Sequence, residues 1–153
     1  MEAIDRVLRE FGARMGMDGL AFDGDGICVL RFDEVTVNLE LERDKGAEGQ
    51  LHAFSVVAEL PQDEARATAV CRHALEQNVG LMLAGAGSVG LRQPHGLVLA
   101  NSVGAAGLDV NGLEAFLERQ VVVAEGMREA AGSIVGEAGD ASPMQIPCTA
   151  LRI

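Results

Sequence analysis

The sequence predicts an α+β domain in which three helices pack on an antiparallel sheet, in the order α-β-β-β-α-β-β-α. Two observations support this fold class. Three segments with strand-like alternation follow one another closely, which favours an antiparallel meander. Segments with helical periodicity lie before, between and after the strands, without the regular alternation of a parallel α/β fold. The length suits one domain, which we expect to span residues 1–132.

The first half of the chain predicts a helix followed by three strands. Residues 2–15 carry apolar side chains at helical spacing and charged side chains on the other face. A Gly- and Asp-rich turn at 23–26 leads into a strand at 27–32. Residues 35–42 alternate strictly between apolar and polar, so we expect one face of this strand to be buried. A third strand is expected at 51–60.

The second half predicts a helix and a hairpin. A continuous stripe from Ala67 to Val79, which includes Val70, Ala74 and Leu75, indicates a helix. Asp63 and Glu64 make its first turn acidic, as the helix dipole favours. Residues 80–87 are small or apolar and contain glycines, and we expect a loop there. The hairpin has arms at 88–92 and 97–100, joined by a turn that contains proline and glycine.

A third helix and a tail complete the chain. Asp109 or Asn111 can cap this helix, and Glu114 is spaced from Asn111 as in a capping box. Its apolar stripe extends to Met127. Periodicity is then lost in a segment that contains Gly, Asp, Ser and prolines. We therefore expect residues 133–153 to be a flexible C-terminal tail that folding does not require.

Charge and composition exclude several classes of partner. The formal net charge of −11 disfavours binding to nucleic acid and to anionic lipid. The chain begins without the basic and apolar regions of a signal peptide, and it lacks the apolar run of roughly 18 residues that a membrane span requires. Three widely spaced cysteines suit a reducing compartment. We expect a cytoplasmic protein without membrane insertion.

Potentially reactive residues do not form a catalytic or metal-binding pattern. His52, His73 and His95 are scattered, without paired ligand spacing. The acidic run at 23–26 lacks the later ligands of a calcium loop, so a turn is the better interpretation. Residues 85–90 match a Gly-x-Gly-x-x-Gly string, but they precede a strand, whereas a dinucleotide loop follows one. We expect no enzymatic activity, no metal and no cofactor.

Several predicted elements are apolar on two sides. In the second hairpin, Val98 and Ala100 point away from Leu97 and Leu99. Either three helices cover all of this apolar surface, or part of it is reserved for a second copy of the chain and for another protein. Composition alone leaves both interpretations open.

The order of elements and the local patterns of the second half resemble the class I chaperones of bacterial type III secretion, the CesT-like family. The similarity covers about residues 2–130 and lies in pattern, not in an invariant motif. The segments that carry it are Leu75-Glu76-Gln77-Asn78, the loop at 80–87, Val89-Gly90-Leu91, Gly96-Leu97-Val98-Leu99 and the Leu-rich helix from Leu113 to Ala124.

This resemblance implies a cytoplasmic bacterial homodimer that binds the N-terminal segment of a secreted effector without ATP and keeps it soluble and competent for secretion. The expected effector-binding residues are Ile4, Leu8, Phe11, Val29, Arg31 and Val35. The expected dimer-interface residues are Val70, Ala74, Val89 and Leu91. Each of these apolar residues also suits the core of a single subunit. The alternative function is that of an unrelated α+β domain that binds a small ligand or docks on a protein to regulate it.

Overall fold

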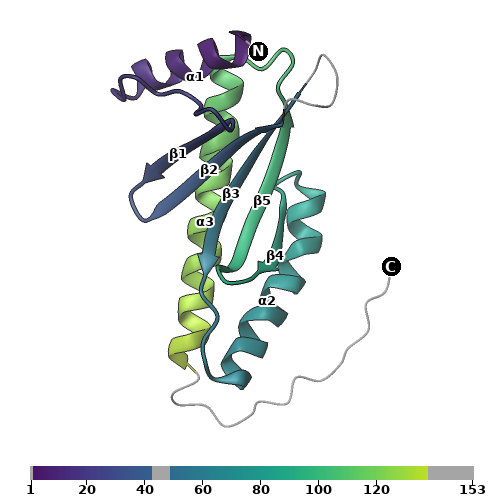
Figure 1. Ribbon diagram of the computed structural model, residues 1–153. Helices are drawn as coiled ribbons and strands as arrows, with labels where there is room; N and C mark the ends of the chain where they lie inside the picture. The colour runs from purple at the N-terminus through teal and green to yellow at the C-terminus, as the bar shows by residue number, and fades with distance from the viewer. Residues whose placement is uncertain (1, 43–48, 138–153) are drawn as a thin grey trace.

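The computed structural model of the protein describes residues 2–42 and 49–137 (Figure 1). The predicted α+β fold is confirmed, with three helices and five strands in the predicted order. In chain order the elements are α1 (Glu2–Arg14), β1 (Ile27–Phe32), β2 (Val35–Glu42), β3 (Gln50–Ala58), α2 (Glu64–Leu83), β4 (Ser88–Arg92), β5 (Gly96–Gly104) and α3 (Val110–Glu137).

The strands form one antiparallel sheet in the spatial order β1-β2-β3-β5-β4. The first three strands make the meander that their short connections predict. β5 pairs with β3, and the short strand β4 pairs only with β5. Within the described chain, β1 and β4 are therefore the edge strands, and each has one side without a neighbouring strand.

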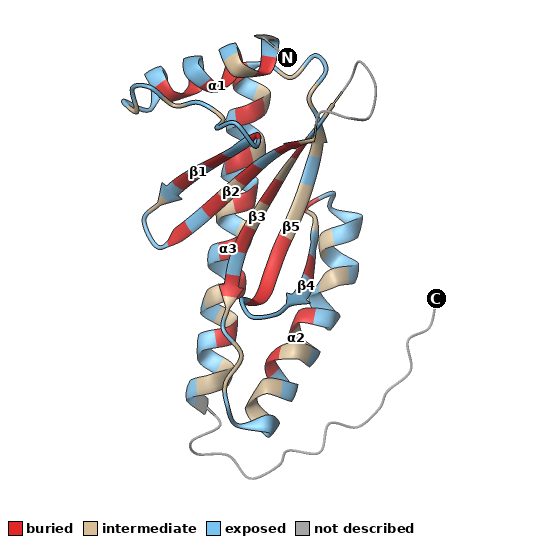
Figure 2. Cartoon of the chain, viewed as in Figure 1, coloured by how far each residue is buried: buried red, intermediate tan, exposed pale blue. Residues whose placement is uncertain are grey.

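The helices cover one face of the sheet and leave the other open. α3 runs behind the strands in Figure 1, α1 packs against α3, and α2 packs against both α3 and β4. Successive side chains of a strand point alternately to the face that the helices cover and to the open face. Buried and exposed residues therefore alternate along the strands (Figure 2). In β2, Val37 and Leu39 are buried beneath the helices while Thr36 and Glu40 are exposed. The expected one-sided burial of this strand is confirmed.

The core forms between the helices and the covered face of the sheet. Its apolar residues come from all eight elements, so that the described chain has one contiguous core. The largest fully buried apolar side chains are Leu8, Phe11, Leu30, Val35, Val37, Leu39, Leu51, Val70, Leu99, Leu113 and Leu117. Leu, Val and Ala provide most of this packing because the chain has no Trp or Tyr.

Two elements extend into segments that the sequence analysis assigned to loops. α2 continues through Gly80 to Leu83, because one glycine costs a helix only about 1 kcal/mol and Leu81 packs against the core. β5 continues beyond Ala100 to Gly104, because it pairs with β3 along the full length of that strand. Tertiary contacts outweigh local propensity in both cases.

α3 also extends further than predicted. It ends at Glu137, beyond residue 132, because Ala131 is buried and Val135 packs against the core. The rest of the predicted tail, residues 138–153, lies outside the described residues.

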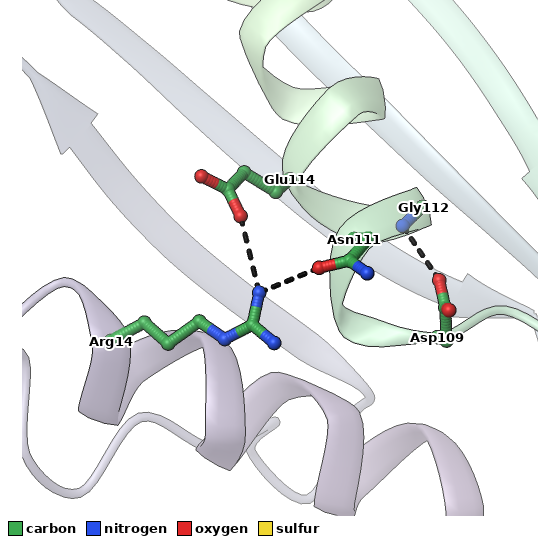
Figure 3. A network of polar contacts seen from close by, with 5 residues as sticks. All are labelled: Arg14, Asp109, Asn111, Gly112 and Glu114. Carbon is green, nitrogen blue, oxygen red and sulfur yellow. Dashed lines mark hydrogen bonds and ion pairs between the residues drawn. The ribbon is translucent and has the colours of Figure 1, made fainter.

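A polar network joins the end of α1 to the start of α3 (Figure 3). Asp109 caps α3, because its Oδ1 accepts a hydrogen bond from the backbone N–H of Gly112 at 2.8 Å. Arg14 donates through Nη1 to Asn111 Oδ1 at 2.7 Å and lies 3.5 Å from Glu114 Oε2. Glu114 therefore pairs with α1 and does not complete the expected capping box. The network fixes where α1 crosses α3.

One polar pair is buried between α3 and the sheet. Gln120 Nε2 donates to Ser55 Oγ at 3.2 Å and to the carbonyl oxygen of Leu99 at 3.3 Å. Neither Gln120 nor Ser55 is accessible to solvent. Gln120 Oε1 has no hydrogen-bond partner among the residues that the structure describes. The pair fixes the register of α3 on β3 and β5.

The Gln120→Ala substitution is expected to lower the free energy of unfolding by roughly 2–4 kcal/mol, because it opens a cavity and leaves the Ser55 hydroxyl without its partner. The double variant Gln120→Met with Ser55→Ala removes both polar groups at similar volume, so it should recover most of this loss. Urea denaturation at one fixed protein concentration measures both effects. A double variant as unstable as Gln120→Ala would contradict this account of the pair.

Candidate functional site

The effector-binding stripe predicted on α1 lies in the core. Leu8 has no exposed surface, and Ile4 and Phe11 are buried with it against the rest of the core cluster. Val35, at the start of β2, is buried as well. These four side chains are almost completely buried in the folded subunit, because α1 covers the core with this stripe and β2 turns Val35 toward the helices.

The other two predicted effector-binding residues lie on the open face of the sheet. Val29 and Arg31 alternate with buried residues along β1, and Val29 is 58% exposed. Because β1 is an edge strand, these side chains stand beside backbone groups that no other described strand pairs with. Part of the predicted site therefore remains at the surface, on the edge strand and not on the helix.

An apolar hollow lies where α1, β1 and α3 meet, with a volume of about 280 Å³. We call it the α1–α3 hollow. Phe11 contributes to it from the core side, and its outer apolar residues include Met15 and Val122, of which Val122 is 60% exposed. Two carboxylates stand among these apolar side chains. The lining residues are Phe11, Met15, Phe32, Glu114, Leu117, Glu118, Val121 and Val122.

A second hollow of about 280 Å³ lies on the open face of the sheet. We call it the open-face hollow. Phe54, Val56 and Val98 provide apolar side chains from the central strands, because β3 and β5 turn their alternate residues toward the helices. Arg92 and His95 line it from the β4–β5 hairpin. Its remaining lining residues are Ile27, Asn38, Leu39 and Glu40.

β1 connects the two hollows. Phe32, the last residue of the strand, lines the α1–α3 hollow, and Ile27, its first residue, lines the open-face hollow. The strand between them spans about 20 Å at the usual rise of a β-strand. Asp23 already bonds the backbone N–H and C=O of Ile27. An extended polypeptide paired with the rest of the free edge of β1 would lie between the two hollows and reach apolar surface at both ends.

The outer side of α2 carries an exposed apolar stripe. Leu75, Val79, Met82 and Leu83 lie at helical spacing, and each is 60–79% exposed. Leu91, at 53% exposed on the neighbouring strand β4, extends this apolar surface. We call these five residues the α2–β4 face.

One of the four predicted dimer-interface residues belongs to the α2–β4 face, and the other three lie in the interior of the subunit. Leu91 is exposed, but Val70, Ala74 and Val89 are buried within the subunit. Asn78 holds the two elements together, because its side chain accepts from the Val89 N–H at 2.6 Å and donates to the Val89 carbonyl at 2.8 Å. The inner side of α2 thus packs within the subunit.

The outer side of α2 does not stand out in the sequence, because the residues of two stripes read as one. Val70, Ala74, Leu75 and Val79 all fall on the single predicted apolar stripe. At 100° per residue these side chains span more than one face, and Met82 and Leu83 extend the outer part. The width of the stripe was the signal that α2 has two apolar sides.

Two of the scattered histidines and cysteines, His52 and Cys28, have contacts that indicate a structural role. His52 Nε2 lies 3.2 Å from Glu42 Oε2, and the His52 ring stacks on Phe54. Burial, and then the negative charge of Asp23, raise the pKa of the Cys28 thiol, which therefore stays protonated at neutral pH. Within residues 2–42 and 49–137, no three metal-ligating side chains cluster.

None of the three described helices combines the length and apolar character that crossing a membrane requires. This finding holds for residues 2–42 and 49–137.

Several solved structures have a fold similar to that of this chain. The ExsC–ExsE complex contains a chain 25% identical to this one, with a TM-score of 0.66, and the match covers 84% of this chain and 92% of that one. A chain of the HopA1–SchA chaperone–effector complex is 22% identical with a TM-score of 0.59, covering 81% and 91% of the two chains. The Yersinia pestis type III secretion chaperone SycH, solved with a fragment of YscM2, is 18% identical with a TM-score of 0.60, covering 81% and 98%.

The sequence itself establishes the family. No curated protein matches the chain at a significant level. The model of the Tir chaperone protein (CesT) family, however, matches residues 6–128, which include almost all of the described elements. The protein therefore belongs to the Tir chaperone protein (CesT) family.

Proposed function

We propose that this protein is a cytoplasmic, ATP-independent chaperone that binds the N-terminal segment of a type III secretion effector and keeps it competent for secretion. Membership of the Tir chaperone protein (CesT) family supports this function, as does its similarity to chains solved in chaperone–effector complexes. The observation that carries the proposal is the free edge of β1, which links the α1–α3 hollow to the open-face hollow.

This geometry suits an extended client. An unfolded segment offers unpaired backbone groups, which the edge of β1 can accept as an added strand. Its apolar side chains can then enter the two hollows at the ends of β1. Ordering an unfolded client costs conformational entropy, so a large and partly apolar contact surface is needed to offset it. Strand pairing and apolar burial supply the free energy of this binding, so the proposed mechanism includes no step that uses ATP.

The client-binding proposal predicts that Val122→Glu weakens effector binding at least tenfold. Val122 is exposed in the α1–α3 hollow, so the substitution leaves the core intact but places a carboxylate where an apolar client side chain would pack. Gly126→Glu is the matched control, because it adds the same side chain one turn further along α3, outside the hollow and in open space. Calorimetric titration with the N-terminal segment of the co-purifying effector measures both affinities.

Circular dichroism and thermal unfolding should give the same fold and similar stability for both variants. Wild-type affinity in a folded Val122→Glu variant would exclude the α1–α3 hollow from the client surface. Failure of the purified wild-type protein to bind any effector through an N-terminal segment would contradict the proposed function itself.

We further propose that the chaperone is a homodimer joined through the α2–β4 face. A subunit that exposes Leu75, Val79, Met82, Leu83 and Leu91 on neighbouring elements has a group of exposed apolar side chains of the kind that marks a protein–protein interface. A two-fold axis would place each face against its own copy, so the same residues are covered on both subunits. This face is separate from the hollows and from β1, so dimerisation leaves the proposed client surface accessible.

A further inference from the structure

β2 and β3 separate before either strand ends (Figure 1). Their ladder ends at the pair Asn38 and Phe54. β2 nevertheless begins at Val35, and β3 continues to Ala58. Along these ends each strand keeps its other neighbour, because β2 still pairs with β1 and β3 still pairs with β5. Within the described chain, the sheet therefore has an unfinished ladder in its interior, in addition to its two outer edges.

A shift in register on the far side of β3 explains the separation. The pairing of β3 with β5 shifts between Val56 and Ala58, as at a β-bulge, which bends a strand and increases its twist. The pairing of β2 with β1 continues to the end of both strands without such a shift. β2 and β3 therefore follow different paths beyond their last pair.

A cleft of about 630 Å³ occupies this gap, and we call it the β2–β3 opening. If the register of the ladder continued, Thr36 would lie opposite Val56. Glu34 would lie opposite Ala58 in the same way. All four residues line the cleft, so the unpaired ends of the two strands form two of its walls.

Thr36 turns its backbone toward the opening. The Leu41 N–H donates to the carbonyl oxygen of Gly26 on the β1 side at 2.9 Å, and alternate residues of an antiparallel strand bond to the same neighbour. The odd-numbered residues of β2 therefore bond to β1, and the N–H and C=O groups of Thr36 point away from β1. No described strand pairs with Thr36 on that side. These two groups can bond one residue of an extended polypeptide.

The inner wall of the opening is apolar and its rim is acidic. The apolar side chains come from the core and from α3, and they are Val57, Val70, Ala131 and Val135. Glu34 and Glu59 are exposed at the rim. Arg128 Nη2 lies 3.7 Å from Glu34 Oε2, whereas Glu59 has no ion-pair partner among the described residues. An apolar side chain and a positive charge on one segment would complement both features.

The opening is continuous with the client surface proposed above. Asn38 and Val56 line both the β2–β3 opening and the open-face hollow. An extended segment that leaves β1 and crosses this hollow would therefore reach the opening next. No residue of the α2–β4 face lines the opening, so the proposed dimer leaves it accessible.

We propose that the β2–β3 opening holds a second part of the extended client, in which an apolar residue is followed directly by lysine or arginine. Successive side chains of an extended backbone point to opposite sides, so the apolar one faces the inner wall and the basic one faces Glu59 at the rim. The client backbone pairs with Thr36. This inference rests on the proposed function, to which it adds a second pairing site and a sequence preference.

Amide hydrogen exchange, read by NMR spectroscopy, tests the backbone pair. The probe is the N-terminal segment of the co-purifying effector, bound to the full-length chaperone. Its binding should slow exchange of the Thr36 amide about tenfold or more, because a new hydrogen bond protects that group.

Gly132→Leu blocks the opening, because Gly132 lines it and a Cβ atom built there meets no atom within 4 Å. The variant should remove the slower exchange of Thr36 and weaken effector binding by about tenfold. Gly126→Leu is the matched control, since it adds the same side chain to open space on the same helix outside the opening, and it should preserve both.

A charge reversal tests the sequence preference. Glu59→Lys should weaken effector binding about threefold, as expected for a surface ion pair turned into a repulsion. Glu129→Lys makes the same change of charge at an exposed position of α3 outside the opening, and it should bind like the wild type. Replacing the basic residue of the effector segment with glutamate should restore the affinity for Glu59→Lys.

The outcomes separate this inference from the proposed function. Calorimetric binding of the effector without slower exchange of Thr36, or with wild-type affinity in a folded Gly132→Leu variant, would overturn the opening as a client site and leave the proposed function intact. Equal affinities of Glu59→Lys and Glu129→Lys would overturn the preference for a basic residue. A wild-type chain that binds no effector would contradict the proposed function and this inference together.

Discussion

Replacing both Leu75 and Val79 with glutamate is expected to convert the dimer into a folded monomer. These side chains lie at the centre of the α2–β4 face and are 68% and 60% exposed in the isolated subunit. Burial of two carboxylates in an apolar interface, against their own copies across the two-fold axis, costs far more than the apolar contacts that they replace. Hot-spot losses of about 2 kcal/mol or more for each residue predict at least a thousandfold weaker association.

The same variant should retain its fold, because neither substituted side chain belongs to the core. Gln77→Glu is the matched control, since it places a glutamate on the opposite, polar side of the same helix, where Gln77 is exposed. Sedimentation velocity measures the oligomeric state, and circular dichroism measures the helix content. A wild-type protein that is monomeric at micromolar concentration, or a double variant that remains dimeric, would contradict the proposed interface.

The strands could be predicted from the sequence because their signal is local. The alternation at 35–42 specifies both a strand and its buried face, and the structure gives β2 these same bounds. The ends of the helices and of β5 could not be predicted in the same way. Gly80 and Gly132 look like helix ends in isolation, and only the packing of Leu81 and Val135 against the rest of the fold shows why the helices continue.

Periodicity identifies an apolar stripe but not what covers it. Ile4, Leu8 and Phe11 show the same spacing whether they contact the core or a client, and the structure places all three in the core. On α2 the single predicted stripe contains residues of two different surfaces. Val70 and Ala74 are buried in the core, whereas Leu75 and Val79 are exposed. To assign an apolar residue to the core or to the surface, one must know where the sheet and α3 lie. Their position depends on contacts between residues that are distant in the sequence.

The exposed apolar residues that form the candidate surfaces had little local signal. Met15 belongs to the apolar stripe predicted for residues 2–15 but follows the last turn of α1, and Val122 lies outside the stripe predicted for α3, so neither residue marks a surface site in the sequence. They come together because α1 packs against α3 through the core, and the exposed contacts of Arg14 with the first turn of α3 add to this arrangement. The hollow is thus a product of tertiary structure, and sequence reasoning reached only its buried member, Phe11.

Leu8→Glu is expected to abolish folding, not merely effector binding. Leu8 has no exposed surface and belongs to the core formed by α1, α3 and the sheet. The substitution removes the packing of a buried leucine, which alone costs about 2–5 kcal/mol, and adds a carboxylate that has no buried partner. Together these losses approach the whole stability of an ordinary domain, about 5–15 kcal/mol. The purified variant should lack a cooperative thermal transition.

Two control variants separate burial from charge. Ala13→Glu places the same carboxylate on the exposed side of α1 and should unfold like the wild type. Leu8→Met keeps the volume and the apolar character, and should cost less than about 1.5 kcal/mol. Differential scanning calorimetry distinguishes the three variants. If Leu8→Glu instead folds with a wild-type transition and loses only effector binding, the α1 stripe must open to admit the client, and the client surface would extend beneath the helix.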